Sequence, residues 1–361
     1  MHYKCLTANN DTTKKLFLRL PGDIYDKNTC PQNKTVERQI LDGTHVLSSE
    51  FEVFPFVIID SDNKPVCRCI LTCYQDDPIG YVGFFESKDQ QSAVDEMMVY
   101  VSRKAKDMGK TMLMGPVDSS IYIGYRFKID RFDKTYTGEP YNKDTYFSMW
   151  KRSGFELSDM YISNHLLPIT DDYQNEKMKK IYDRYIEKGY QIISPTPEIL
   201  DECLREVYSL MMDSFSNFVG YKKITEQQFL DMFLGLGSIA DLNMIKLAYD
   251  KEYDLKAFSI ALPNYNDLLL GKLTIAKKMK IAKIKQSPSE YVVLYAGANK
   301  KVAGLGCAVS YATIEEMRKR SCSSIGALIH EGNMTGRIYD ELYTDSFHYA
   351  LLTKRLTPGG N

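Results

Sequence analysis

The segment from Ser289 to Ser321 reads SEYVVLYAGANKKVAGLGCAVSYATIEEMRKRS and combines three local patterns. Val, Tyr and Leu dominate its first ten residues, which favours a strand. Apolar residues recur at helical spacing in its last part, at Ala308, Ala312, Ile314 and Met317. Gly304 and Gly306 lie between these two parts. The segment therefore predicts a strand, a glycine loop and a helix in direct succession.

A glycine loop at the start of a helix is suited to bind an anion. Gly304 and Gly306 lack a Cβ atom, so the backbone can approach a bulky ligand closely. The first turn of the helix directs unpaired N–H groups and the positive end of the helix dipole toward that ligand. A pyrophosphate group fits such a loop. A dinucleotide-binding fold or a plain tight turn also contains this pattern, so the loop alone does not decide between them.

Lys301 precedes the glycines and completes the pattern Lys-x-x-Gly-x-Gly. This pattern resembles the pyrophosphate loop of GNAT-fold (Gcn5-related) N-acyltransferases, which bind acyl-CoA. The family has Arg or Gln at the first position, so Lys301 departs from it. The resemblance implies that the CoA donor contacts the residues of the loop, which are Lys301, Val302, Ala303, Gly304, Leu305, Gly306, Cys307 and Ala308.

The segments after the loop follow the order of elements in the same family. They predict a strand at 324–330, a turn at 331–333, a short helix at 334–343 and a closing strand at 347–353. In the family, an Asn after the fifth strand begins a short helix that carries a Tyr. Asn333, Tyr339 and Tyr343 match that order, whereas the usual Gly-Phe pair after the helix is absent.

Length and composition are those of an ordinary globular protein. The chain has 361 residues, enough for two domains, with 44% hydrophobic residues and a formal net charge of -1. This charge balance does not favour a nucleic-acid partner. No apolar run approaches the roughly 20 residues that a membrane helix needs, and the first residues lack the apolar core of a signal peptide. We expect a cytoplasmic monomer or homodimer with no membrane partner.

The eight cysteines are scattered, and the only cluster is Cys67, Cys69 and Cys73. No second pair at metal-ligand spacing accompanies this cluster, which favours buried thiols over a zinc site. The five histidines form no ligand pattern. The sequence therefore predicts no metal.

The first half of the chain predicts the same order of elements as the second. Residues 16–25 predict a short strand or turn. The elements that follow are a hairpin at 51–60 and 65–74, a strand at 79–86, a helix at 91–108, a strand at 111–116, a helix at 144–152 and a strand at 156–167. This repeated order indicates two copies of one fold.

The loop after the third strand of the first half differs from the glycine loop. Residues 86–91 read ESKDQQ, with two carboxylates where a pyrophosphate would lie and no glycine. The runs GPVDSS at 115–120, EPYNKDTY at 139–146 and SGF at 153–155 also resemble a bacterial family of tandem GNAT proteins. We therefore interpret the first half as a degenerate copy. Its loop residues suit a structural role or a contact with substrate equally well.

The clearest break in the chain is the run SPTP at 194–197, which follows a charged helical segment. It divides the chain into a degenerate GNAT-like domain, residues 1–195, and a GNAT domain with the acyl-CoA-binding loop, residues 196–361. The fold class is α/β, with two tandem GNAT-like domains that each contain a mixed, mostly antiparallel central sheet flanked by helices. Thr225 and Gln228 predict a capping box at a helix start in the second domain.

A basic run lies between the strands of the second half and contains Lys272, Lys277, Lys278, Lys280, Lys283 and Lys285. It suits a patch for an acidic partner or for the 3′-phosphate of CoA. A solvated insertion explains it more simply, because few aromatic residues lie among the lysines.

Acyl transfer from a CoA thioester to an amine needs a held donor, hydrogen bonds to the tetrahedral oxyanion, an acceptor for the amine proton and an acid for the leaving thiolate. In the GNAT fold the central strand carries a bulge and separates from the next strand. The resemblance therefore implies free backbone N–H groups at residues 293–299. It also implies that the donor contacts Leu294, Tyr295, Ala296 and Asn333.

Family analogy makes Tyr339 the first candidate for the acid and Tyr343 the second. Glu290 can accept the amine proton if it faces the cleft, although a solvent-facing Glu at the strand end fits the sequence equally. Cys307 lies at a helix N-terminus, where we expect its pKa to fall. The chemistry nevertheless resembles direct transfer, without an acyl-enzyme.

The sequence thus predicts an acyl-CoA-dependent N-acyltransferase that uses acetyl-CoA, or another acyl-CoA, as donor substrate and the amine of a small molecule as acceptor. One alternative is aminoacyl or long-chain acyl transfer, as in tandem GNAT relatives that use aminoacyl-tRNA or fatty acyl donors. The lack of excess positive charge argues against tRNA. Another alternative is a non-catalytic CoA-binding sensor or scaffold.

Overall fold

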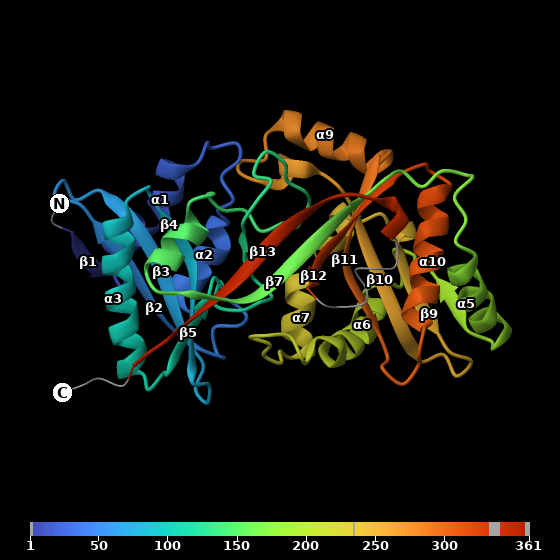
Figure 1. Cartoon of the computed structure of the whole chain (residues 1–361), viewed down its shortest axis with the longest axis horizontal. Coiled ribbons are helices and arrows are strands. Elements are labelled where there is room, and N and C mark those ends of the chain that lie inside the picture. The colour runs from blue at the N-terminus through green and yellow to red at the C-terminus, as the bar shows by residue number, and fades with distance from the viewer. Residues whose placement is uncertain (1–2, 234, 332–339, 358–361) are drawn as a thin grey trace.

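A single mixed sheet runs along the long axis of the molecule, with helices on both of its faces (Figure 1). The computed structural model describes residues 3–233, 235–331 and 340–357. The first half contains β1 (Lys4–Thr7), α1 (Asp11–Ile24), α2 (Lys34–Asp42), β2 (Glu52–Ile59), β3 (Pro65–Cys73), β4 (Ile79–Ser87), α3 (Gln91–Asp107), β5 (Met112–Gly115), β6 (Phe127–Lys128), α4 (Tyr146–Arg152) and β7 (Glu156–Leu166).

The second half contains α5 (Glu176–Glu187), β8 (Gln191–Ile193), α6 (Leu200–Phe215), α7 (Glu226–Phe233), α8 (Leu236–Ile239), η1 (Leu242–Met244), β9 (Ile245–Tyr249), β10 (Leu255–Pro263), η2 (Asn266–Leu269), α9 (Ile275–Gln286), β11 (Glu290–Ala298), α10 (Leu305–Arg318), β12 (Ser323–His330), η4 (Asp340–Leu342) and β13 (Tyr343–Arg355). The strand order is β1-β2-β3-β4-β5-β13-β7-β12-β11-β10-β9-β8, and β6 pairs with β13. Most pairs are antiparallel, and the parallel pairs are β4 with β5 and β11 with β12.

Strand β3 shows how the core of the first half forms. All nine of its residues are buried. Alternate side chains point to opposite faces, so Ile70 packs in the cluster that contains Phe17 of α1. Cys67 and Cys69 pack in the cluster that contains α3. The predicted buried thiols are thus confirmed for both cysteines, and the described residues contain no group of His, Cys, Asp and Glu arranged to hold a metal ion.

Helix α1 differs from the short strand or turn predicted at residues 16–25. Its start is fixed by a capping box in which the Thr13 N–H donates to Asn10 Oδ1 at 3.1 Å. Pro21 lies inside the helix and cannot donate to the Phe17 carbonyl. The buried guanidinium of Arg68 donates to that carbonyl instead, at 3.1 Å. A tertiary contact therefore satisfies the bond that Pro21 removes, which is why the Pro-Gly pair does not end the helix.

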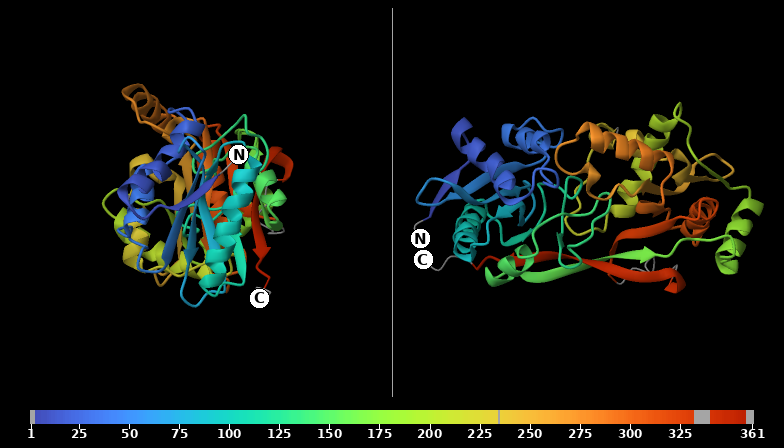
Figure 2. Two further views of the ribbon diagram at one scale, coloured as in Figure 1. Left: turned by 90° about the vertical axis from the view of Figure 1, so that its left-hand side faces the viewer. Right: turned by 90° about the horizontal axis from the view of Figure 1, so that it is seen from above.

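The two halves exchange their closing strands. Strand β5 of the first half pairs with β13, the last strand of the second half, while β12 of the second half pairs with β7 of the first. Strands β7 and β13 also pair with each other along most of their length, from Leu166 with Tyr343 to Glu156 with Thr353. They lie side by side across the middle of the molecule in both views (Figures 1 and 2). The sheet therefore continues across the domain boundary predicted at residue 195.

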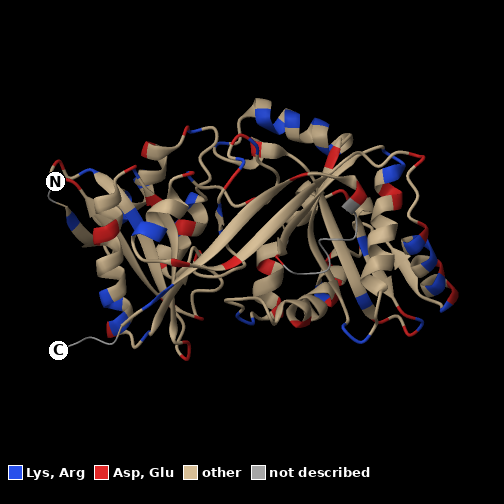
Figure 3. Cartoon of the chain, in the orientation of Figure 1, with Lys and Arg blue, Asp and Glu red and all other residues tan. Residues whose placement is uncertain are grey.

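Two other sequence-based predictions concern helices of the second half. The capping box at the start of α7 is confirmed, because the Gln228 N–H donates to Thr225 Oγ1 at 3.2 Å and the Thr225 N–H donates to Gln228 Oε1 at 2.7 Å. Most of the basic run lies in α9, a helix with no buried residue at the outside of the molecule (Figure 3). Within the described ranges, no helix has both the length and the apolar content to cross a membrane.

The strand exchange predicts that neither half folds alone. In a protein of residues 1–195, β7 would lose β12 and β13, which are its neighbours on both sides, and β5 would lose β13. Unpaired strands expose backbone groups and apolar side chains. We expect residues 1–195 and residues 196–361 to aggregate or lack a cooperative thermal transition when expressed separately. Co-expression should restore a soluble complex, measured by gel filtration and near-UV circular dichroism. A soluble single half with a cooperative transition would contradict this account.

Candidate acyl-transfer site

Strand β11 carries the bulge that the family resemblance implied. Its antiparallel register with β10 pairs Val293 with Ala261 and Tyr295 with Ile260, so Leu294 is an extra residue. The parallel pairing of β11 with β12 ends at Val293 and Gly326. Beyond that point the two strands separate. Because successive peptide groups of a strand alternate in direction, part of the backbone of residues 294–298 faces the resulting gap.

Strand β12 is irregular at the same level. Its register with β7 shifts between Gly326 and Ile329, and Leu328 has a positive φ of 57°. The Leu328 N–H donates to Ser163 Oγ at 2.8 Å, which ties this conformation to β7. Bulges in both strands thus hold the gap open from its two sides.

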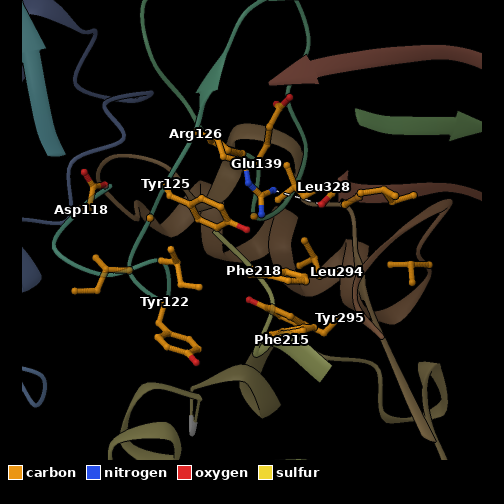
Figure 4. A pocket seen from close by; sticks show the side chains of 18 of the residues that line it. Asp118, Tyr122, Tyr125, Arg126, Glu139, Phe215, Phe218, Leu294, Tyr295 and Leu328 are labelled. Carbon is orange, nitrogen blue, oxygen red and sulfur yellow. Dashed lines mark hydrogen bonds between the residues drawn. The ribbon is translucent and has the colours of Figure 1, made fainter. Parts of the chain in front are cut away.

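The gap opens into a large cavity between the halves, of about 1040 Å³. Leu294, Tyr295 and Ala296, which were predicted to contact the donor, are among the residues that line it. Arg126 and Glu139 line it from loops of the first half (Figure 4). Gly138 belongs to the same loops, and a Cβ atom on it would lie 3.0 Å from a methyl group of Leu294. The first half therefore forms one wall of the cavity, in close contact with the bulge of β11.

The glycine loop has the backbone conformation of an anion-binding helix start. Gly304 has a φ of 87°, a backbone conformation that residues with a side chain rarely adopt, and α10 begins at the next residue. Leu305 and Ala308 are fully buried, backbone included, whereas Gly304 is exposed and Gly306 is half-buried. Tyr185 of α5 donates from its hydroxyl to the Ala303 carbonyl at 2.6 Å and so supports the loop from behind. A Cβ atom on Gly306 would make only an ordinary van der Waals contact, 3.6 Å from the Cβ atom of Ala298.

Two cations near this loop were not among the predicted residues. Lys300 lines the cavity, whereas the predicted Lys301 is exposed and not among the lining residues. The Arg184 guanidinium of α5 lies 3.6 Å from the position of a Cβ atom on Gly304. Arg184 could not be found from the local pattern, because α5 and α10 meet only in the folded chain.

The structure does not bring Glu290 to the cavity. Its carboxylate lies 2.5 Å from His165 Nε2 and accepts hydrogen bonds from Asn264 at 2.5 Å and Ser323 at 2.9 Å. Burial alone would raise the pKa of Glu290, but these hydrogen bonds outweigh it and the net pKa is lowered. A carboxylate with its oxygens occupied and a lowered pKa is poorly suited to accept a proton. The geometry therefore does not support a role of Glu290 as base.

The candidate acids are placed differently from the prediction. Tyr339 and Asn333 lie outside the described residues. Tyr343 was predicted at the end of a helix but is the first residue of β13, and it lines the cavity. Its assignment to a helix is corrected, because backbone pairing with Leu166 of β7 extends the last strand by several residues.

Cys307 does not have the lowered pKa expected at a helix N-terminus. Burial raises the pKa of its thiol, and the nearby Lys177 reduces this effect only in part. A thiol with a raised pKa is a poor nucleophile at neutral pH. This environment agrees with direct transfer to the acceptor.

The corresponding gap in the first half is closed by the chain itself. Strands β4 and β5 pair in parallel only as far as Tyr81 with Met114 and then separate. The Val117 N–H donates to the Val82 carbonyl at 2.9 Å, and the Phe84 N–H donates to Asp118 Oδ1 at 2.5 Å. A Cβ atom on Gly83 would lie only 1.9 Å from the Val117 carbonyl oxygen. The segment after β5 therefore occupies the space in which a pantetheine arm would lie.

Several charged side chains are buried in this half. Arg68 forms a bidentate ion pair with Glu37, with both hydrogen bonds at 2.7 Å. Burial raises the pKa of Glu86 to about 7, although Arg68 and the Tyr146 hydroxyl lower it. Burial also raises the pKa of Asp118 to about 6. Acidic groups of this kind disfavour a bound phosphate.

Glu86 gives a prediction about pH and stability. Its pKa is about 7 in the folded chain and 4.5 as its ordinary value, so it favours folding below about pH 4.5 and opposes folding as the pH rises through 7. We expect Glu86→Gln to gain stability relative to wild type by up to about 3 kcal/mol between pH 5 and pH 9. Urea unfolding at several pH values measures this, with Glu187→Gln as an exposed control. A difference between Glu86→Gln and wild type that is constant with pH would contradict it.

Solved structures match the fold over nearly the whole chain. A tandem GNAT protein from the clavulanic acid biosynthesis pathway is 13% identical, with a TM-score of 0.53, and the match covers 99% of this chain and 100% of that one. A conserved protein of Enterococcus faecalis V583, described as a probable N-acyltransferase, is 10% identical, with a TM-score of 0.51. The match covers 99% of this chain and 73% of that one. A GCN5-related N-acetyltransferase of Kribbella flavida is 8% identical, with a TM-score of 0.51. The match covers 98% of this chain and 72% of that one.

No protein family model matches the sequence, and no curated protein matches it. The identities to the solved structures are low, so these similarities establish the fold and not the substrate. Together with the bulge, the separated strands and the glycine loop, they confirm the resemblance at the level of architecture: the chain has the tandem GNAT fold.

Proposed function

We propose that this protein is an acyl-CoA-dependent N-acyltransferase that transfers an acyl group, in the simplest case acetyl from acetyl-CoA, to the amine of a small molecule. The observation that carries this proposal is the gap between β11 and β12, which lies on the same side as the glycine loop at the start of α10. Such a gap offers a slot for an extended thioester arm, and the loop offers a site for its pyrophosphate.

The proposed donor site follows from this arrangement. The pyrophosphate would contact the backbone N–H groups of Gly304 and Gly306, with Arg184 and Lys300 supplying positive charge. The pantetheine arm would run along residues 294–298 toward the bulge. There, backbone N–H groups would donate to the thioester carbonyl and stabilise the oxyanion. Lys301 faces solvent and is no longer the favoured charge partner.

The reaction transfers one acyl group between two nucleophiles. The amine nitrogen attacks the thioester carbonyl carbon, a C–N bond forms, and the tetrahedral oxyanion then collapses with cleavage of the C–S bond. The amine releases a proton and the CoA thiolate takes one up. Tyr339 remains the first candidate for the acid that supplies this proton, and Tyr343, which lines the cavity, is the second.

The shape of the cavity supports a small acceptor. Loops of the first half cover the gap, and the gap of the first half is filled by Val117 and Asp118. Among the described residues, the open gap therefore lies in the second half and is covered by loops of the first half. An extended protein substrate would need an open groove across the gap, whereas Gly138 lies directly against Leu294.

Gly306 tests the donor site. Gly306→Asp places a negative charge at the proposed pyrophosphate position, and Gly306→Asn has nearly the same shape without the charge. We expect the Asp variant to raise the Kd for acetyl-CoA at least about tenfold over the Asn variant by charge repulsion. Its folded state should be as stable or more stable, by about 0.3–1 kcal/mol, because a carboxylate favours a helix N-terminus. Calorimetric titration and thermal unfolding measure the two effects.

The titration also tests the proposed function as a whole. Wild-type protein should bind acetyl-CoA or a longer acyl-CoA saturably and release CoA thiol when amines are added. A folded wild-type protein that binds no CoA species would refute the donor assignment. Tight binding without turnover on any amine would favour the non-catalytic sensor.

Substitution of the two tyrosines tests which of them supplies the proton to the CoA thiolate. Tyr339→Phe removes the proposed proton donor, and we expect kcat to fall by about 100-fold, within the usual range for general acid catalysis, with little change in the Kd for acetyl-CoA. Tyr343→Phe is the matched control, with an expected effect of less than about fivefold. Steady-state kinetics measure both. Equal activity of wild type and Tyr339→Phe, with a large loss in Tyr343→Phe, would reverse the assignment.

A further inference from the structure

Arg126 is a buried cation at the wall of the cavity. It lies between β5 and β6, directly before Phe127, and its side chain has only 6% of its possible exposure. Its φ of 78° is unusual for a residue with a side chain, and its N–H donates to the Pro116 carbonyl at 3.0 Å. A strained backbone therefore holds this side chain in place, a feature often found at functional sites.

Two tyrosines hold the guanidinium group in one orientation. Its central carbon lies 3.7 Å from the ring centroid of Tyr125 and 3.9 Å from that of Tyr161. Figure 4 shows the group within the cavity, with its terminal nitrogens directed toward Leu328. Stacking of this kind leaves the edge of the guanidinium, which carries its hydrogen-bond donors, available to a ligand.

That edge has few partners among the described residues, one of which is the Tyr161 side chain. One terminal nitrogen donates to the Leu328 carbonyl at 3.5 Å, which is a long and weak hydrogen bond. The buried Nε atom has no hydrogen-bond partner. Among the described side chains, no Asp or Glu forms an ion pair with Arg126. Burial lowers the pKa of Arg126 to about 10, so it still carries its charge at neutral pH.

The other buried cations of the described chain have an ion pair or strong hydrogen bonds, although the Nε atom of Arg68, like that of Arg126, has no hydrogen-bond partner. They are Arg68, Lys110 and Lys128. Arg68 pairs with Glu37 at 2.7 Å, and Lys128 with Glu139 at 2.8 Å. Lys110 donates to two backbone carbonyls at 2.6 Å. Burying a charge without a partner is costly, so the contrast indicates that the partner of Arg126 is a ligand.

The position of Arg126 relates this ligand to the acyl-transfer site. Leu328 belongs to β12 at the level where β12 has separated from β11, and Tyr295 of β11 also interacts with the charge of Arg126. The guanidinium thus lies beside the gap in which the thioester would be held. The cations proposed for the donor phosphates, Arg184 and Lys300, lie at the glycine loop instead.

We propose that Arg126 binds a carboxylate of the acceptor, so that the substrate is a small molecule that carries both an amine and a carboxylate, as an amino acid does. This inference rests on the proposed function and adds the class of acceptor. A planar guanidinium matches a carboxylate through two parallel hydrogen bonds, which would fix the distance from the carboxylate to the attacking amine. The tyrosine rings around it exclude water and strengthen the pair.

The experiment compares matched acceptors with acetyl-CoA as the donor. Free amino acids, their carboxamides and the corresponding simple amines are assayed by release of CoA thiol, with wild type, Arg126→Gln, Arg126→Lys and the exposed control Arg103→Gln. We expect wild type to prefer the carboxylate over the carboxamide. Arg126→Gln should raise KM for the carboxylate on the order of 100-fold, a typical effect of breaking a buried charge pair, and should remove the preference. The Kd for acetyl-CoA should stay within about twofold.

Thermal unfolding separates this role from a structural one. Because no Asp or Glu among the described residues balances the charge, Arg126→Gln should unfold at the same temperature as wild type or higher. The same amino acids should raise the unfolding temperature of wild type but not of Arg126→Gln. Arg68→Gln, which breaks a buried ion pair, should unfold at a lower temperature.

Several outcomes would overturn the inference. One is equal use of carboxylate and carboxamide by wild type. Another is no effect of amino-acid carboxylates on either turnover or unfolding temperature. A third is a fall in kcat of Arg126→Gln without a change in KM, which would assign Arg126 to stabilisation of the oxyanion. A preference of wild type for succinyl-CoA over propionyl-CoA that Arg126→Gln abolishes would move the carboxylate to the donor. Failure of wild type to bind any acyl-CoA refutes the proposed function separately, because the effect of carboxylates on unfolding does not require a donor.

Discussion

Backbone pairing between β7 and β13 is the constraint on which the rest of the structure depends. Each of these strands ends one half of the chain and lies next to the counterpart strand of the other half, β12 or β5. Each backbone hydrogen bond contributes only about 0.5–1.5 kcal/mol, but the pairing extends over most of both strands. This pairing fixes the relative position of the halves and so sets the loops around Arg126 against the gap of the second half.

The two copies of the fold differ at the point where their parallel strands separate. In both, a parallel pair of strands separates after a short stretch. In the second half the gap remains open, with a glycine loop and positive charge at its end. In the first half Val117 and Asp118 fill it, and the carboxyl group of Glu86 is buried near the end of β4. Under the proposed function, the second half would hold the donor and the first half would form a wall for the acceptor.

Local patterns in the sequence predicted the features that local forces determine. The capping box at Thr225, the strand before the glycine loop and the succession of elements in both halves depend on neighbouring residues. The prediction of a short strand or turn at residues 16–25 was wrong because Pro21 and Gly22 indicate a turn. The hydrogen bond from Arg68 to the Phe17 carbonyl allows helix α1 to continue there. The bulge at Leu294 was inferred from family resemblance, since nothing in its own residues marks it.

The remaining features come from contacts between distant segments. The exchange of closing strands cannot be seen in the sequence, because either pairing satisfies the same alternation of side chains. Arg126 reaches Leu328 across 202 positions of the chain, and the absence of an ion pair to it among the described residues is a property of the folded molecule. Glu290 looked suitable as a base by its place on the strand, but His165 and Asn264, from two other segments, occupy its carboxylate.

Hydrogen–deuterium exchange in the presence of acetyl-CoA tests the central claim most directly, because it locates the donor on the chain without assuming an acceptor. If the open gap of the second half holds the donor, amides of residues 294–306 and 327–330 become protected, while those of residues 82–87 and 116–120 do not change. Protection along β4 and β5, or none in the glycine loop at saturating ligand, would contradict the assignment of one open and one filled site.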